Sequence, residues 1–147
     1  MITNERQLKI TKAQVARFEQ TLTRLQDASS DGISSLSPVL RRAERDAVSS
    51  QLETLRAEIG EYESLRRGEP RVFEADSLAD LPLLLIKARI SRGMTQRDLA
   101  ERMGLKEQQI QRYEGTGYAS ASLHRVQEVI EALQVQVSER VFLSPPT

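Results

Sequence analysis

The chain has no cysteine, and this absence excludes several classes of protein. Its 147 residues also lack tryptophan, and aromatic residues make up only 4% of them. Without a thiol there is no disulfide, no thiolate metal site and no cysteine nucleophile, so nothing points to an oxidising compartment. With so few aromatic rings, Leu, Ile, Val and Ala must build the core.

Long apolar runs are missing as well. No stretch approaches the roughly 18 consecutive apolar residues that a membrane helix needs. Residues 1–20 mix charges throughout and have neither an apolar core nor a small-residue cleavage site. We therefore expect a cytoplasmic protein that is neither secreted nor inserted in a membrane.

Signatures of catalysis are absent too. The sequence has no glycine-rich phosphate loop and no nucleophile elbow, and its single histidine, His124, has no cysteine with which to share a metal. Its acidic residues alternate with Lys and Arg at helical spacing, which is typical of solvated, ion-paired helix faces. We expect no catalytic residue, no metal site and no cofactor, and we do not expect an enzyme.

The net charge is zero, since 21 basic residues balance 21 acidic ones. A neutral chain is not expected to coat nucleic acid indiscriminately. The distribution is uneven, however, because between Ile86 and Arg112 seven basic residues stand against three acidic ones. A local basic excess of this kind is a feature of surfaces that bind nucleic acids.

The N-terminal half has the pattern of two long helices. A stripe of apolar residues at helical spacing predicts a first helix over residues 11–26, and Ser29 to Ser35 predict a loop. Ser37 is suited to cap a second helix that begins at Pro38 and runs to about Arg67. The stripes are Val15, Phe18, Leu22 and Leu25 in the first helix, and Val48, Leu52, Leu55, Ile59 and Tyr62 in the second.

These stripes predict an antiparallel helical hairpin, or a coiled coil formed with the helices of a second subunit. Gly68 to Pro70 end the second helix and mark the boundary between two domains. We assign residues 1–70 to dimerisation or partner binding, and residues 71–147 to a second domain.

The second domain has the pattern of four short helices. The predicted helices are Leu83–Ser91 with Asp80 as cap, Gln96–Met103 capped by Thr95, Lys106 to about Glu114, and a helix marked by Leu123, Val126, Val129, Ile130 and Leu133. Leu84, Leu85 and Ala88 are expected to form the buried face of the first. After Leu133 the apolar period changes to two, with Val135, Val137, Val141 and Leu143, which predicts a short strand or hairpin.

The segment from Thr95 to Glu114 carries the functional prediction. Ala100 is small where two helices must cross closely, and Gly104 permits a turn that larger residues disfavour. Long polar side chains then remain on the outside at the start of the next helix. Side chains of this kind can reach base edges in the major groove of DNA, where Arg can pair with guanine, Gln with adenine, and Glu can accept from cytosine. These outward residues are Lys106, Glu107, Gln108, Gln109 and Arg112.

This segment resembles the Xre family of lambda-repressor-like helix-turn-helix proteins, over roughly residues 78–134. The resemblance implies that Thr95 and Gln96, the family's Thr-Gln opening, belong to the DNA-binding site and that Gln96 contacts a DNA phosphate. It implies that Glu107, Gln108 and Arg112 read bases, with Lys106 and Gln109 near the backbone or an adjacent base. It also places Arg89 and Glu114 at an internal ion pair, to which we assign a role in stability.

Taken together, the expected fold is all-α: a long N-terminal helical hairpin or coiled coil, a lambda-repressor-like helix-turn-helix domain, and a short C-terminal strand. The expected function is a dimeric repressor that binds a palindromic operator in double-stranded DNA and regulates its own operon. One alternative is the antitoxin of a type II toxin–antitoxin module, with a toxin bound by the N-terminal helices. Another is an adaptor without DNA affinity. The dimer contact stays open between the N-terminal helices and residues 135–143.

Overall fold

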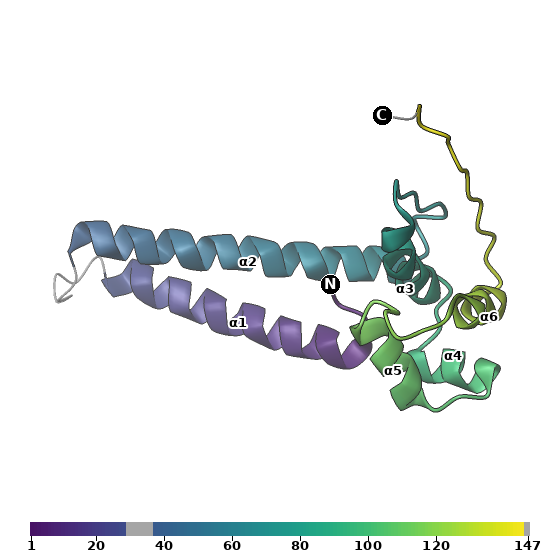
Figure 1. Ribbon diagram of the computed structural model, residues 1–147. Coiled ribbons are helices and arrows are strands. Elements are labelled where there is room, and N and C mark those ends of the chain that lie inside the picture. Colours follow the sequence, from purple (N-terminus) through teal and green to yellow (C-terminus); the bar gives the residue numbers. More distant parts are fainter. Residues whose placement is uncertain (29–36, 146–147) are drawn as a thin grey trace. The chain divides into compact units, whose positions relative to one another are not determined.

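The computed structural model describes residues 1–28 and 37–145, and all regular structure in that part of the chain is helical, as predicted (Figure 1). The chain divides into two compact units, Met1–Pro70 and Arg71–Thr147. No helix among these residues is both long and apolar enough to cross a membrane. The helices are α1 (Glu5–Ala28), α2 (Pro38–Arg66), the 3-10 helix η1 (Leu78–Asp80), α3 (Leu81–Ser91), α4 (Gln96–Met103), α5 (Glu107–Gly115) and α6 (Leu123–Leu133).

The first unit is a helical hairpin in which α1 and α2 lie side by side (Figure 1). The helix α2 begins as predicted, because Ser37 Oγ accepts a hydrogen bond from the backbone N–H of Leu40 at 3.2 Å and Pro38 occupies the first turn. The helix α1 begins earlier than predicted, because Asn4 Oδ1 accepts from the backbone N–H of Gln7 at 2.9 Å and caps an additional turn. The predicted loop at residues 29–35 lies outside the described residues.

The apolar stripes of the hairpin are only partly buried. Leu52 and Tyr62 of α2 are buried, whereas Val15, Phe18, Leu22 and Leu25 of α1 are each half-buried. Each helix of the hairpin has only one neighbouring helix to pack against, which covers less of an apolar stripe than a full core does. Part of the apolar stripe of α1 therefore stays accessible to solvent.

Ion pairs tie the two helices together at their polar edges. Lys12 Nζ lies 2.8 Å from Glu63 Oε1, and Arg56 Nη2 lies 2.7 Å from Glu19 Oε1. The hydrogen bond and the charge of Lys12 hold the pKa of the Glu63 carboxyl below its usual value. These pairs are exposed, so they contribute little to the stability of the hairpin and serve mainly to fix its register.

The second unit has a compact core. The helix α4 packs on both α5 and α6, and α3 packs on α6. The side chains that are almost completely buried are those of Ile90, Leu99, Ile110, Val129 and Leu133. Leu84, which was expected to be buried, is half-buried, and Leu123 lies on the exposed side of α6.

The start of α3 differs from the prediction. Asp80 precedes the helix, but its side chain makes no capping hydrogen bond and its backbone is already helical. The reason is that η1 comes directly before α3 and includes Asp80. Ser77 caps this short helix instead, since its Oγ accepts from the backbone N–H of Ala79 at 3.1 Å.

The predicted C-terminal strand is not formed in the single chain. Gln134 ends α6 in the left-handed region, and residues 135–145 have no regular secondary structure. In Figure 1 this segment leaves α6 as an extended trace. A strand is defined by hydrogen bonds to a neighbouring strand, and the described residues offer it none.

Candidate nucleic-acid interface

The N-terminus of α4 is fixed by a reciprocal cap. Thr95 Oγ1 accepts from the backbone N–H of Asp98 at 3.0 Å, and the Asp98 carboxylate accepts from the backbone N–H of Thr95 at 2.8 Å. These hydrogen bonds from Thr95 hold the pKa of the Asp98 carboxyl below its usual value. The predicted cap is therefore confirmed, and it defines where α4 begins.

The turn between α4 and α5 sets the angle at which the two helices cross. Gly104 adopts a φ of +66°, a left-handed conformation that side chains with a Cβ rarely adopt. The backbone N–H of Leu105 then donates to the Ala100 carbonyl at 2.8 Å. Leu99, Ala100 and Ile110 are almost completely buried. The expected roles of Ala100 and Gly104 follow directly from this packing.

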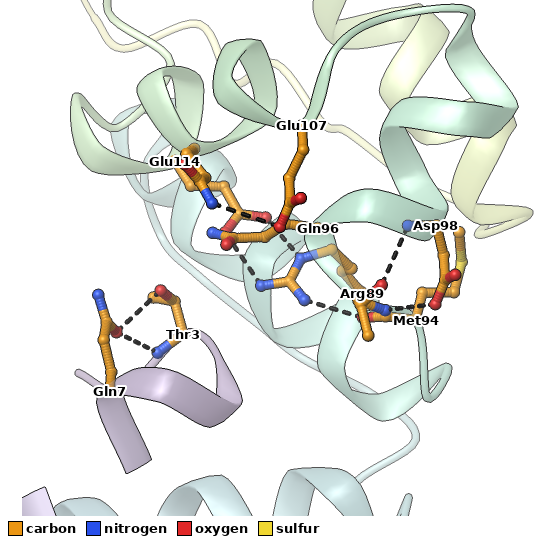
Figure 2. A network of polar contacts seen from close by, with 10 residues as sticks. Thr3, Gln7, Arg89, Met94, Gln96, Asp98, Glu107 and Glu114 are labelled. Atoms are coloured by element: carbon orange, nitrogen blue, oxygen red, sulfur yellow. Dashed lines mark hydrogen bonds and ion pairs between the residues drawn. The ribbon is translucent and has the colours of Figure 1, made fainter. Parts of the chain in front are cut away.

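A buried polar network joins α3, α4 and α5 (Figure 2). Arg89 Nε donates to Glu114 Oε1 at 2.6 Å and Arg89 Nη2 donates to Glu114 Oε2 at 3.0 Å, with each side chain only 2% exposed. Arg89 Nη1 also donates to the Met94 carbonyl at 2.8 Å. The expected internal ion pair is thus present, in the bidentate geometry that is the strongest for arginine and a carboxylate.

Gln96 belongs to the same network. Its side-chain Nε2 donates to Glu114 Oε2 at 2.7 Å, and the residue is only 5% exposed. The structure therefore places the Gln96 side chain inside the domain, whereas the preceding Thr95 is exposed. A phosphate contact by Gln96 requires its amide to turn toward the surface, and it stays a prediction.

The loop after α5 covers one side of this network, a feature that the sequence analysis missed. Gly117 and Tyr118 both have positive φ angles, and the backbone N–H of Tyr118 donates to the Tyr113 carbonyl at 2.7 Å. The Tyr118 ring is buried and stacks on Tyr113, with ring centroids 5.7 Å apart. Burial, and then the charge of Glu114, raise the pKa of the Tyr118 phenol.

The remaining predicted site residues lie at the N-terminus of α4 and along α5. Thr95, Lys106, Glu107, Gln108, Gln109 and Arg112 are all exposed. Gln109 Oε1 accepts from the backbone N–H of Lys106 at 2.9 Å, so this side chain also caps α5. Gln111, which the sequence analysis did not single out, is exposed as well, and its Nε2 lies 3.4 Å from Glu107 Oε1. Its position four residues after Glu107 places it on the same helix face as Glu107, and this spacing could have identified it from the sequence.

The excess of basic residues between Ile86 and Arg112 is smaller at the surface of the domain than in the sequence. Arg89 is neutralised by Glu114, and Arg97 pairs with Glu101 at 3.1 Å. Arg92 and Arg102 donate to backbone carbonyls at the end of α6. No ion pair within residues 1–28 and 37–145 engages Lys106 or Arg112, and both side chains are exposed.

The comparison with protein families agrees with this geometry. Residues 85–140 match the helix-turn-helix family model, from the middle of α3 to beyond the end of α6. This segment is an Xre-type, lambda-repressor-like helix-turn-helix domain, so the chain contains a DNA-binding regulatory domain. No curated protein and no solved structure matches the chain. Among the described residues no group of three or more His, Asp or Glu side chains is arranged to hold a metal ion.

Proposed function

We propose that this protein is a sequence-specific transcriptional regulator that binds a palindromic operator in double-stranded DNA as a homodimer and represses its own operon. The observation that carries the proposal is the exposed pair Gln108 in the first turn and Arg112 in the last turn of α5. Four residues apart on a helix, the two side chains share one face. The cap at Thr95, the turn at Gly104 and the buried network hold that face in one orientation.

Each exposed side chain has a distinct part in this proposal. Arg112 pairs with the O6 and N7 atoms of a guanine, Gln108 with the N6 and N7 atoms of an adenine, and Glu107 accepts from a cytosine amino group. Lys106, Gln109 and Thr95 lie where the DNA backbone passes the first turns of α4 and α5, and they contact phosphates there. Gln96 adds a phosphate contact once its amide leaves the network.

The charge balance of the chain has a consequence for affinity. Non-specific binding to DNA comes from phosphate neutralisation, and its salt dependence reports the number of phosphates contacted. The chain has no net charge, and Arg89 and Arg97 are already paired with glutamates. The protein therefore binds random DNA weakly, and its specificity rests on the base contacts of α5 and on dimer avidity.

The test is fluorescence anisotropy on a duplex from upstream of the protein's own gene, at one fixed salt concentration, with a scrambled duplex as reference. The double variant Gln108→Ala, Arg112→Ala is expected to lose the preference for the upstream duplex and to keep its fold. The matched control is Gln20→Ala, Arg24→Ala, which removes the same residue types at the same spacing from exposed positions of α1. Equal binding of both duplexes by the wild type would refute autoregulation.

A second candidate function rests on the hairpin. The half-buried stripe of α1 favours an antitoxin whose hairpin binds a toxin, with DNA binding by the second unit as autoregulation. The test is co-purification of the full chain with the product of the adjacent gene. It compares Phe18→Asp with Gln20→Asp, which adds the same charge at an exposed position off the stripe. Loss of the complex with Phe18→Asp alone supports this function. Equal behaviour of the two variants contradicts it.

A further inference from the structure

The C-terminal arm, residues 135–143, has a pattern that the fold of the single chain does not use. Val141 is 90% exposed and Leu143 is 95% exposed, although both are aliphatic. Val135 and Val137 at the start of the arm are half-buried, whereas Gln136 and Ser138, which alternate with them, are exposed. Because side chains alternate along an extended backbone, these four aliphatic residues share one face of the arm, with Glu139 at its centre.

The base of the arm is held in place by the domain. Arg92 Nη2 donates to the Gln134 carbonyl at 2.5 Å, and Arg102 Nη1 donates to the Ala132 carbonyl at 3.0 Å. These cations lie at the C-terminal end of α6, where they also interact favourably with the helix dipole. The backbone N–H of Val135 donates to the Ile130 carbonyl at 3.4 Å. The arm therefore leaves α6 in a defined direction.

The aliphatic positions of the arm read the same in both directions, whereas the exposed aromatic Phe142 lies on the other face and has Gln136 as its counterpart. Counting outward from Glu139, Val137 corresponds to Val141 and Val135 corresponds to Leu143. An antiparallel pair of identical strands related by a two-fold axis brings just such positions opposite one another. Shifting the axis by one residue, to Ser138 or Arg140, places Glu139 opposite a valine and spoils the match.

We propose that the arm pairs with the arm of a second copy of this chain, as a two-stranded antiparallel ribbon with its two-fold axis at Glu139. This inference rests on the homodimer of the proposed function and names the segment that forms it. In the ribbon, Val141 and Leu143 of each copy lie beside Val137 and Val135 of the other. They cover the half-buried side chains of Val135 and Val137, and the backbone groups of the arm gain hydrogen-bond partners.

The register also determines which polar and charged side chains of the two copies lie opposite one another. On the opposite face, Ser138 of one copy lies across from Arg140 of the other. At the axis the two Glu139 side chains face each other, and like charges directly opposite weaken a strand pair. The Glu139→Gln variant is therefore expected to form a tighter dimer than the wild type.

The first experiment is sedimentation equilibrium of the full chain without DNA. Val141→Asp is expected to raise the dimer dissociation constant by about tenfold or more, because it places a charge on the apolar face. Ser138→Asp is the matched control, since it puts the same charge on the other face, opposite Arg140, and leaves the dimer intact. Both positions are exposed in the single chain, so neither variant disturbs its fold.

The second experiment uses the absence of cysteine from the chain. Under mild oxidation, Glu139→Cys is expected to give a disulfide-linked dimer, because only residues at the axis meet their own copies. The exposed Val72→Cys is the control, and it is expected to form no disulfide-linked dimer under the same oxidising conditions. A monomeric wild type, or a dimer equally tight in Val141→Asp, overturns the proposal. In the latter case the hairpin is the interface, and operator binding by α5 stands unaffected.

Discussion

Replacing Glu114 by leucine tests the buried network that holds α3, α4 and α5 together. The substitution leaves the Arg89 guanidinium, whose side chain is 2% exposed, without its bidentate partner, and it removes the acceptor of Gln96 Nε2. Removing one partner of a buried pair costs about 3–5 kcal/mol, because the other charge stays buried without compensation. For a unit of this size, that free energy corresponds to a fall in Tm of at least about 12 °C.

The matched control is Glu101→Leu. Glu101 pairs with Arg97 at 3.1 Å, but this pair lies on the surface of α4, with the two side chains 64% and 74% exposed. Exposed pairs of this kind contribute about 0.2–1 kcal/mol, so the control is expected to stay close to the wild type. Both variants replace a glutamate that pairs with an arginine, and the two ion pairs differ in their burial.

The assay is urea unfolding followed by the NMR signals of Leu99 and Ile110, which report on the second unit alone. Adding Arg89→Met to Glu114→Leu removes the unpaired charge. The double variant should therefore lose at least about 1 kcal/mol less than the sum of the two single variants. A cost below about 1 kcal/mol for Glu114→Leu, or strict additivity in the double variant, would refute the reasoning.

Three further changes probe the local devices that shape the site. Thr95→Ala removes the acceptor for the Asp98 N–H, and chemical denaturation should show a loss of about 0.5–2 kcal/mol; no loss would contradict the cap. In Gly104→Ala the new Cβ meets no atom within 4 Å, but the alanine must adopt a φ of +66°. Thermal unfolding should therefore show a loss of about 1–2 kcal/mol in the free energy of unfolding, from backbone strain alone. Because the pKa of Asp98 is lowered from 3.8 in the folded state, its contribution is complete above pH 3.8 and is lost as the pH falls through the lowered pKa. Asp98→Asn should flatten this dependence in acid titrations of stability, and an unchanged profile would contradict it.

Periodicity and capping residues were sufficient to predict most of the helices. Ser37 with Pro38 and Thr95 with Asp98 define helix starts through local hydrogen bonds, and such bonds depend only on neighbouring residues. Asp80 failed as a cap because η1 precedes α3, which depends on the conformation of the preceding turn. The spacing of Val15 and Phe18 predicted a helix, but their degree of burial depends on what packs against the hairpin.

The candidate site was predictable in its outline and less so in its polar contacts. The exposed start of α5 followed from the motif, and so did the pairing of Arg89 with Glu114. The hydrogen bond from Gln96 to Glu114 joins residues on different helices and depends on their crossing angle, so spacing alone did not predict it. The positive φ of Tyr118 was also hidden, because non-glycine residues in this conformation leave no sequence pattern.

The central claim is that α5 reads bases in an operator, and selection from a random duplex library tests it most directly. Wild-type protein is expected to enrich an inverted repeat with half-sites about 10 base pairs apart, centre to centre. Arg112→Ala should lose the preference for guanine at one position in each half-site and retain the preference elsewhere, while Gln20→Ala, Arg24→Ala should select the wild-type motif. Failure of the wild type to enrich any motif, or an identical motif from Arg112→Ala, would contradict the account.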